Sequence, residues 1–540
     1  MSKSWNTLEH NGVKFPDPYV PLPSKVKILY KGKPVSLDSK NTNNKFNISS
    51  EEAAYLYSLI AERDKRFSEE KKNYSKWTDD EKLNENFWSD WKKILAKDSN
   101  GSKIEDFSKV DFSPIIDYIQ ERKEKLDKER KALSKEEKQE IKKQKQEEKE
   151  KYGYAKIDGE KVAIGNVTVQ PPQLFTGHGK HPLRGKIKGR VKKEDIVLNG
   201  TKVPKGPWKT IKDPKVTYLA YYNNPLTGER VHINLSRNES KFVKNADRTK
   251  FDKARTLGEN IEKIREKYTQ DMSSDNQQKR ELATATYLLD VIAIRPGTEK
   301  DEKTESDTKG LTTLTCESIS FGDDKQITLN FMGKSSIPFI KTFNVTKLAY
   351  KNLKSLCENK KGSKKLFKNV DATTLNGYLK TLLPNLTAKV FRTYKSSSIL
   401  QKKLQENMPD VDAPVHEKKI AFNQANVEAA LALNHKKLNT DTEKQVTKLK
   451  DKLKELKKKK KEAKTDKQKQ TAEKNIKVME TKIMEAELNI STITSKSNYS
   501  DPRIIVQWAK KTETPIEQLY NKSQLTKFVW SMDTSSTWKF

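Results

Sequence analysis

Two patterns of hydrophobic and polar residues alternate along the chain, and they predict different elements. Apolar residues recur every three or four positions in several long stretches, which predicts helices. These stretches cover residues 50–100, 245–295 and 345–440. Residues 113–153 are mostly charged, and two helices are predicted there from their starts, Ser113-Pro114 and the capping box Ser134 to Glu137. Residues 155–235 instead mix short apolar runs with Gly, Pro and His, which indicates strands and loops. The segment "KQITLNFMGKSSIPF" alternates apolar and polar residues before a Gly-Lys turn, so it predicts a β-hairpin with Lys334 at its tip.

Residues 441–490 carry a different helical pattern, with apolar residues at heptad spacing. The apolar positions are Val446, Leu449, Leu453 and Leu456 and, after a polar break, Ile476, Met479, Ile483, Ala486 and Ile490. Two such helices joined by a polar turn predict an antiparallel coiled-coil hairpin. Lysine fills many of the remaining positions, and two interpretations stay open: a solvated charged face, or a face that makes salt-dependent contacts with phosphates.

Two predicted helix boundaries lie next to residues of chemical interest. Pro296-Gly297 is expected to stop the preceding helix immediately after Arg295. Asp501-Pro502 is expected to start another helix just after Tyr499. The start of that helix is therefore predicted to fix the orientation of the Tyr499 side chain.

The composition adds expectations about domains and partners. With 540 residues the chain is too long for one core, so we expect a multidomain α+β protein of two to four domains. Lys and Arg number 108 against 74 Asp and Glu, a formal net charge of +34. This excess predicts a polyanionic partner, either nucleic acid or an anionic membrane surface. No apolar run is long enough to span a bilayer, and no signal peptide or presequence pattern is expected at the N-terminus.

The chain has only two cysteines, Cys316 and Cys357. They exclude a disulfide framework and a cysteine-based zinc site, and they fit a reducing intracellular compartment. No metal-ligand spacing, phosphate-binding loop or dinucleotide fingerprint occurs in the sequence. Any chemistry is therefore expected to need neither a metal nor a nucleotide cofactor.

A metal-free reaction is possible if a tyrosine attacks a phosphodiester. A phenol with a pKa of about 10 is neutral at pH 7, so cations must stabilise the charge that develops. Two arginines and a histidine suit the phosphate oxygens, and a lysine can protonate the leaving oxygen. The chain offers such a set in order, as Arg295, Lys334, Arg392, His435 and Tyr499. In so basic a chain this order also arises by chance, which leaves local packing or capping as the alternative role of Tyr499.

Longer strings around these residues are more specific. They are "LEHNGVKFPDPYVPLP", "FSKVDFSPIIDYI", "PPQLFTGHGKHP", "IRPGTEKDE", "LTAKVFRTY", "NHKK" and "SNYSDPRIIVQWAKKTETPIEQLYNKSQLTKFVW". On these strings and their spacing, the chain resembles the eukaryotic-type DNA topoisomerase I family (type IB) over nearly its whole length. The resemblance implies a bilobed clamp around double-stranded DNA, with a mainly helical catalytic lobe, a coiled-coil linker and a small helical C-terminal domain. The implied divisions are an N-terminal DNA-binding core or cap lobe (1–236), a catalytic core lobe (237–440), the linker (441–490) and the tyrosine-carrying domain (491–540).

The resemblance also implies relaxation of positive and negative supercoils without ATP or metal. Tyr499 would form a 3′-phosphotyrosyl bond, Arg295, Arg392 and His435 would hold the scissile phosphate, and Lys334 would protonate the 5′ oxygen from the minor-groove side. The free strand would rotate about the intact strand before its 5′ hydroxyl reverses the reaction. We expect a monomer that acts in the nucleus, with a viral or mitochondrial location as alternatives. The long charged N-terminal tail typical of nuclear members is missing, which suggests a trimmed form or a compact or viral genome.

Further DNA contacts are expected from residues near the family motifs, namely His178, Lys180, His181, Thr298, Lys300 and Asn498. Some of these positions depart from the family pattern. His178 replaces a usual arginine, Ser335 replaces an aspartate after the lysine, and "RPGT" stands where the family has Arg-Ala-Gly-Asn. These departures leave the five catalytic positions filled. They leave open the minor-groove contacts and the binding of camptothecin-type inhibitors, although Asn498 matches the family.

Two rival functions share parts of this pattern. A tyrosine recombinase uses nearly the same chemistry, but it requires strand exchange between protomers and gives no reason for a long linker before the tyrosine. A non-catalytic basic clamp or chromatin-binding protein would bind DNA without cutting it, although such a protein has little reason to keep all five residues. Replacing Tyr499 by Phe separates an enzyme from a clamp, since DNA binding should survive and turnover should not.

Overall fold

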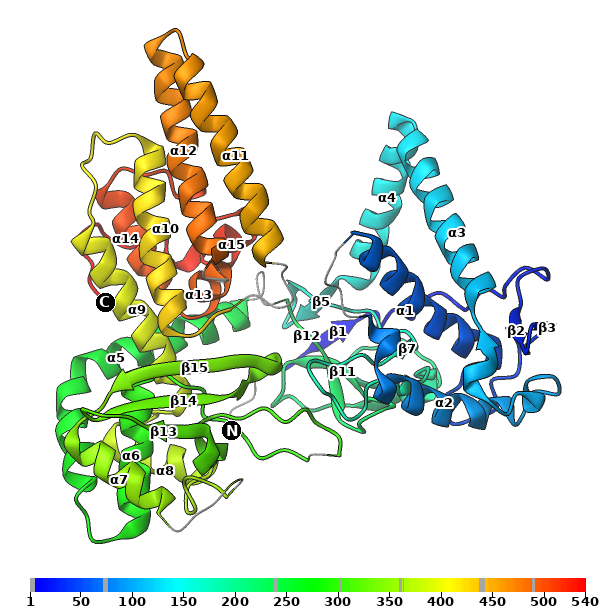
Figure 1. Ribbon diagram of the computed structural model, residues 1–540, viewed down its shortest axis with the longest axis horizontal. Helices are drawn as coiled ribbons and strands as arrows, with labels where there is room; N and C mark the ends of the chain where they lie inside the picture. Colours follow the sequence, from blue (N-terminus) through cyan, green and yellow to red (C-terminus); the bar gives the residue numbers. More distant parts are fainter. Residues whose placement is uncertain are drawn as a thin grey trace. The chain divides into compact units, whose positions relative to one another are not determined.

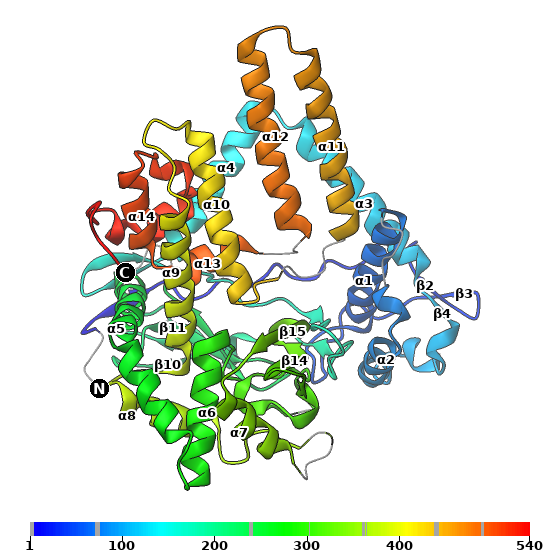
Figure 2. The same ribbon diagram turned by 60° about the vertical axis from the view of Figure 1, so that its left-hand side comes forward.

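A computed structural model describes residues 5–70, 76–236, 241–301, 303–358, 362, 364–436, 442–487 and 491–540. The chain divides into two compact units, residues 1–241 with 301–307 and residues 242–300 with 308–540. Each unit combines helices with sheets (Figures 1 and 2), which confirms the predicted α+β, multidomain class. The clamp and the four-part division stay predictions; Ile490 and the boundaries near 237, 440 and 490 lie outside the described residues.

The first unit has a helical part with an aromatic core. Its elements are α1 (Ser50–Glu70), α2 (Glu81–Leu95), α3 (Ser113–Ala132), α4 (Lys135–Tyr152), and the short strands β2 (Ile28–Tyr30), β3 (Lys33–Val35) and β4 (Val110–Asp111), which form a sheet in the order β3-β2-β4. Phe87 and Trp91 are fully buried, and the ring centroids of Phe87 and Tyr57 lie 4.7 Å apart. These aromatic contacts hold the helices around one core.

The same unit has a β-rich part with a separate core, as predicted for residues 155–235. One sheet has the order β1-β5-β6 and another β10-β9-β11-β12. Their strands are β1 (Leu8–His10), β5 (Tyr154–Ile157), β6 (Glu160–Ala163), β9 (Val197–Asn199), β10 (Lys209–Ile211), β11 (Tyr218–Asn223) and β12 (Arg230–Asn234); β7 (Gln173–Leu174) pairs with β8 (Ile187–Lys188). Leu8, Leu198 and Tyr222 are among the side chains buried in this second core.

In the second unit, helices surround a three-stranded antiparallel sheet with the order β13-β14-β15. Its elements are α5 (Lys241–Asp271), α6 (Gln277–Ile292), β13 (Ile319–Phe321), β14 (Gln326–Gly333), β15 (Ile337–Asn344), α7 (Lys347–Cys357), α8 (Ala372–Leu382), α9 (Ala388–Glu406) and α10 (Val415–Ala432), followed by α13 (Thr492–Asn498), α14 (Pro502–Lys511) and α15 (Lys522–Lys527). Helix α9 contributes Phe391 to the core around the sheet and Leu400 to the core around α14. One continuous helix therefore belongs to both cores of this unit.

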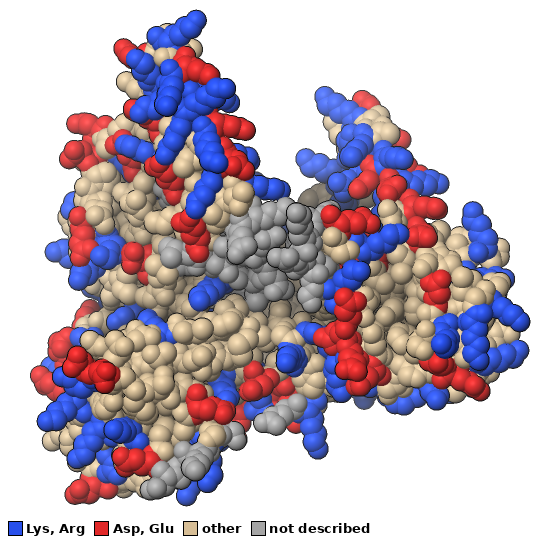
Figure 3. Space-filling model, viewed as in Figure 1, with Lys and Arg blue, Asp and Glu red and all other residues tan. Residues whose placement is uncertain are grey.

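Between α10 and α13, α11 (Thr442–Glu462) and α12 (Asp466–Glu487) lie side by side (Figures 1 and 2). Ion pairs join Lys450 to Glu487 at 2.8 Å and Lys460 to Glu473 at 2.7 Å, which fixes an antiparallel register. Lys and Arg side chains crowd the surface of this hairpin (Figure 3). The coiled-coil packing of its apolar positions stays a prediction.

Candidate active site

Arg295 lies in a loop after α6 and not at the end of that helix. The helix ends at Ile292 because Ala293 adopts a left-handed backbone with φ of 50°, so the boundary predicted at Arg295 is wrong. The loop contains Gly297, whose φ of +81° suits glycine. A Cβ on Gly297 would lie 2.9 Å from the Cα of Gly310, so the two backbones touch. Leu311 also donates its N–H to the Arg295 carbonyl at 2.8 Å, and these contacts fix the backbone that carries the arginine.

Lys334 lies at the tip of the β14–β15 hairpin, as the alternating pattern predicted. The two strands pair in register from Gln326 opposite Asn344 to Gly333 opposite Ile337. The turn between them places Ser335 and Ser336 at φ values of 62° and 55°, which a serine adopts only at some cost. The exposed Lys334 thus stands at the tip of a fully paired hairpin, next to a strained turn.

Arg392 comes from the first half of α9 and is 3% exposed. It donates hydrogen bonds to the carbonyl oxygens of Ala293 and, at 3.1 Å, of Leu433. Its Nε has no hydrogen-bond partner among the described residues. The guanidinium is therefore held by backbone carbonyls and keeps unused capacity to bind an anion.

His435 follows α10 and is 5% exposed. Its Nε2 lies 3.3 Å from Nη2 of Arg392. A guanidinium can only donate, so Nε2 is the acceptor and the proton of the neutral ring resides on Nδ1. Within the described part of the chain, Nδ1 has no hydrogen-bond partner. The imidazole therefore keeps one unused donor.

Tyr499 lies in the turn between α13 and α14, where Asp501 caps α14 as the sequence predicted. Arg295 donates a hydrogen bond from Nη1 to the Tyr499 hydroxyl at 3.2 Å. The guanidinium carbon of Arg392 lies 5.0 Å from the centroid of the Tyr499 ring, and the His435 ring centroid is also 5.0 Å from it. Three of the predicted residues therefore converge on the phenol from three separate elements.

A pocket of about 280 Å³ connects this cluster with the lysine. Arg295, Lys334, Arg392 and His435 all line it, and so does Lys309. Lys309 is held by Thr315 at 3.0 Å and by Glu317 at 3.3 Å. None of the described residues that line the pocket is acidic. The pocket thus offers an anion several cations and a neutral imidazole.

The local charges shift the pKa values of three of these side chains. Burial raises the pKa of Tyr499, but the charges of Arg392 and Arg295 outweigh burial, and the pKa lies below the ordinary value of 10. Burial and the two arginines lower the pKa of His435 to about 3, so this imidazole is neutral at pH 7. Burial and the charge of Arg295 lower the pKa of Arg392 to about 10, which leaves it a cation at pH 7.

The other predicted DNA-contact residues lie in both units. In the second unit, Thr298, Lys300 and Asn498 are exposed, and the Asn498 carbonyl accepts from Lys250 at 3.0 Å. In the first unit, His178 and Lys180 are exposed on a loop. His181 is different because its ring packs edge-on against Phe175 at 4.6 Å, and Nδ1 accepts the Leu183 N–H at 3.1 Å. These contacts give His181 a role in shaping the loop.

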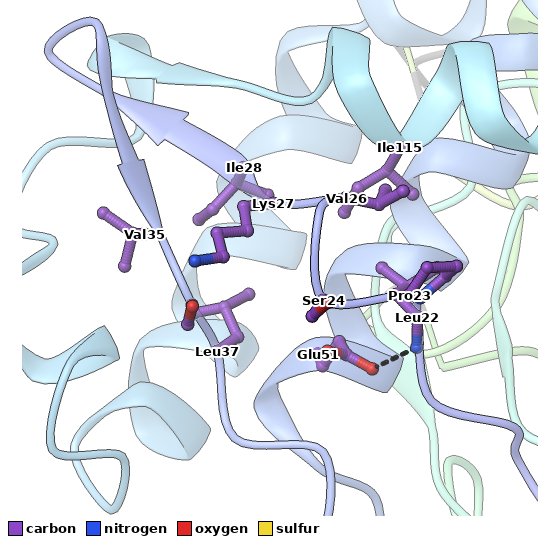
Figure 4. A pocket seen from close by; sticks show the side chains of 11 residues that line it. Leu22, Pro23, Ser24, Val26, Lys27, Ile28, Val35, Leu37, Glu51 and Ile115 are labelled. Atoms are coloured by element: carbon purple, nitrogen blue, oxygen red, sulfur yellow. Dashed lines mark hydrogen bonds between the residues drawn. The ribbon is translucent and has the colours of Figure 1, made fainter.

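Neither a small pocket of the first unit nor a metal site offers a second catalytic centre in the described residues. A small pocket in the first unit (Figure 4) is lined mostly by apolar side chains, and its one carboxylate, Glu51, already accepts from Tyr19 and from the Leu22 N–H. Across the described ranges, no group of His, Cys, Asp and Glu could hold a metal ion. Nor does any helix there have the length and apolar character to cross a membrane.

Comparisons with known proteins match nearly the whole chain to domains of one protein family. Residues 3–235 match the family model for the eukaryotic DNA topoisomerase I DNA binding fragment, residues 239–467 the catalytic core, and residues 467–540 the C-terminal topoisomerase domain. DNA topoisomerase 1 of Homo sapiens is 34% identical in an alignment 573 positions long, which covers 98% of this chain and 71% of the human protein. The chain belongs to the eukaryotic DNA topoisomerase I family.

Other members of the eukaryotic DNA topoisomerase I family are similarly related. DNA topoisomerase 1 of Caenorhabditis elegans is 34% identical in an alignment 569 positions long, which covers 99% of this chain and 67% of that protein. DNA topoisomerase 1 alpha of Arabidopsis thaliana is 37% identical in an alignment 578 positions long, which covers 100% of this chain. The chain spans 60% of the length of this Arabidopsis relative.

Sequence reasoning missed several residues of this topoisomerase-family site. Lys309 was not singled out, because a lysine between Thr308 and Gly310 has no distinguishing neighbours. The buried pair Ser396 and Ser397 was missed too. The run of three serines inside a helix was the available signal, because serine is a poor helix former and needs a reason to be there.

Proposed function

We propose that the chain relaxes positive and negative DNA supercoils by transient cleavage of one strand. Tyr499 is the nucleophile that attacks a phosphodiester and forms a 3′-phosphotyrosyl bond while the 5′ oxygen leaves. The observation that carries this proposal is the Tyr499 hydroxyl, which accepts from Arg295 at 3.2 Å and lies among three predicted phosphate ligands. The lowered pKa of Tyr499 supports the same role, because the two arginines that favour its phenolate also suit a phosphate.

Each of the other residues has a distinct part in the proposed reaction. Arg295 and Arg392 neutralise the non-bridging oxygens of the scissile phosphate as charge develops. His435, neutral at pH 7, donates a hydrogen bond to the phosphate without adding charge. Lys334, at the tip of its hairpin, protonates the departing 5′ oxygen.

The rest of the cycle follows from the covalent intermediate. The phosphotyrosyl bond conserves the energy of the broken phosphodiester, so neither ATP nor a metal ion is required. The free strand rotates about the intact one and then religates when its 5′ hydroxyl attacks the phosphotyrosine. The partner is double-stranded DNA, bound by a monomer that acts in the nucleus. His178, Lys180, Thr298, Lys300 and Asn498 are proposed to contact it, and the +34 net charge supports such a partner.

The test is relaxation of supercoiled plasmid in EDTA without ATP, at several salt concentrations. The wild-type chain should relax the plasmid and, when denatured during turnover, remain covalently attached to 3′ ends. Tyr499→Phe should bind DNA with unchanged affinity and relax nothing. Tyr394→Phe is the matched control, because it removes the hydroxyl of another half-buried tyrosine without touching Tyr499. Tight binding without relaxation by the wild type would instead support a non-catalytic clamp.

A further inference from the structure

Helix α9 carries two buried serines that face the turn of the nucleophile. Ser396 and Ser397 are both 0% exposed. Buried hydroxyls are unfavourable unless they form hydrogen bonds, and serine is a poor helix former. Their presence in the middle of α9 therefore calls for specific partners.

Among the described residues, these two hydroxyls hydrogen-bond only to residues 495–501, the segment that contains Tyr499. Ser396 Oγ lies 3.1 Å from Ser495 Oγ and 3.0 Å from Ser500 Oγ. Ser397 Oγ donates to the Tyr499 carbonyl at 3.3 Å and accepts the Asp501 N–H at 3.0 Å. Ser396 thus holds the two ends of the turn, and Ser397 holds the backbone of the nucleophile itself.

The turn that carries Tyr499 is also held by burial and by a backbone hydrogen bond. Ser495, Ser500 and Asp501 are each 0% exposed. The Tyr499 N–H donates to the Ser495 carbonyl at 2.9 Å, which closes the last turn of α13. The two α9 serines therefore satisfy polar groups that would otherwise be buried without partners.

The same helix carries a phosphate ligand. Arg392 precedes the serines by four and five residues, about one helical turn or 6–8 Å along the axis. Its guanidinium carbon lies 5.0 Å from the Tyr499 ring centroid. Helix α9 therefore sets both the position of the arginine and the position of the tyrosine backbone.

We propose that Ser396 and Ser397 are positioning residues that hold Tyr499 in line with the phosphate bound by Arg392. This inference rests on the proposed function and deepens it. The hydroxyls never touch DNA; they act through the backbone of residues 495–501. Small errors in the alignment of a nucleophile can cost about 100-fold in rate.

The experiment measures single-turnover formation of the covalent complex on a DNA duplex at a site mapped with the wild-type chain. The scissile strand ends a few nucleotides beyond the cleavage position, so the released fragment dissociates and religation stops. Ser397→Ala should lower the cleavage rate about 10- to 100-fold, with the DNA dissociation constant within about twofold of wild type. Ser397→Thr, which keeps the hydroxyl, should restore most of the rate. Ser398→Ala is the matched control in the same helix, since Ser398 bonds to Tyr394 and should leave the rate unchanged.

A second substrate separates the nucleophile from the leaving group. It carries sulfur in place of the bridging 5′ oxygen, and a thiolate leaves without a proton because thiols are far more acidic than alcohols. Lys334→Ala should regain cleavage on this substrate, whereas Ser397→Ala should stay slow. If Ser397→Ala does not fold, Ser397→Thr and Ser397→Cys carry the test, and the hydroxyl-bearing variant should cleave faster.

The outcomes separate this inference from the proposed function. A wild-type chain that forms no covalent complex would refute the proposed function itself. If the wild type cleaves, the positioning role is overturned by any of three results: cleavage by Ser397→Ala at the wild-type rate, recovery of Ser397→Ala on the sulfur substrate, or a loss of DNA affinity as large as the loss of rate.

Discussion

The neutral state of His435 leads to a quantitative prediction about pH. An ordinary histidine with a pKa of 6.5 would be about 90% neutral at pH 7.5 and about 10% neutral at pH 5.5, a tenfold change. Burial and the charges of Arg392 and Arg295 lower the pKa of His435 to about 3. At both pH values more than about 99% of His435 is then neutral. Protonation of His435 should therefore have no effect on the cleavage rate between pH 5.5 and pH 7.5.

The assay compares wild type with His435→Gln, which keeps a neutral hydrogen-bond donor but cannot titrate. Covalent-complex formation is measured at DNA concentrations below saturation, because the second-order rate constant reports the groups of the free protein. The ratio of the wild-type to the His435→Gln rate cancels the titration of every group that the two proteins share. We expect this ratio to stay constant within about twofold between pH 5.5 and 7.5. His435→Ala, which removes the donor, should lose about 100- to 1000-fold in rate.

One result would refute this reasoning. A ratio that falls about tenfold toward pH 5.5, with a midpoint near 6.5, would show that the free protein holds His435 with an ordinary pKa. The burial and the neighbouring arginines would then not dominate its titration. A constant ratio together with equal rates for His435→Gln and His435→Ala would contradict the donor role instead.

Three further predictions concern the parts that support the site. Gly297→Ala should slow cleavage about 10- to 100-fold with DNA affinity retained, because its Cβ would push against Gly310 and move the Arg295 loop. Gly377→Ala is the control, because a Cβ there meets nothing within 4 Å, and an unchanged cleavage rate for Gly297→Ala would contradict this role of Gly297. Ser335→Gly should raise the free energy of unfolding, measured in urea, by about 0.5–1 kcal/mol, since a φ of 62° suits glycine better; a lower urea midpoint would count against strain in the turn. Replacing the exposed Lys459 and Lys461 of α11 by Gln should reduce the slope of log K against log salt by up to about 1.8 if the hairpin contacts phosphates, and an unchanged slope would favour a solvated face.

The elements that local chemistry specifies were predictable from the sequence. Strict alternation before a Gly-Lys turn placed the β14–β15 hairpin and Lys334 correctly. The Asp501-Pro502 pair placed the start of α14 for the same reason, since an N-cap and a proline act within one turn of chain. Such signals depend on neighbours in sequence and not on the rest of the fold.

The end of α6 was not predictable because tertiary contacts determine it. Ile292, Ala293 and Ile294 are all buried, so the apolar pattern runs past the point where the helix stops. Ala293 takes a left-handed conformation that alanine rarely adopts alone. Arg392, about a hundred residues away, donates to the Ala293 carbonyl. A side chain distant in sequence thus helps to hold the bend that carries Arg295.

The sequence alone also could not predict that the site residues come together in space. Its five residues come from separate elements, and only the longer family strings singled them out among 108 Lys and Arg residues. The sequence pattern favours exposed side chains at Ser396 and Ser397, because polar residues on a helix are typical of a solvent-facing side. They are buried because the segment that packs on them is itself polar, at Ser495, Ser500 and Asp501. Pairing of polar groups between distant segments leaves no periodic signal in either segment.

The shifted pKa values also explain why the site should attract an anion such as a phosphate. With no acidic residue among the described lining of the pocket, Arg392 and His435 both have pKa values displaced toward the neutral form. Burial and an excess of positive charge cause both shifts, and that charge raises the free energy of the empty pocket. A phosphate diester supplies the missing negative charge, so its binding should raise both pKa values toward their ordinary range. The attraction would increase further as the reacting phosphate gains charge, and the same cations would then favour the transition state over the bound substrate.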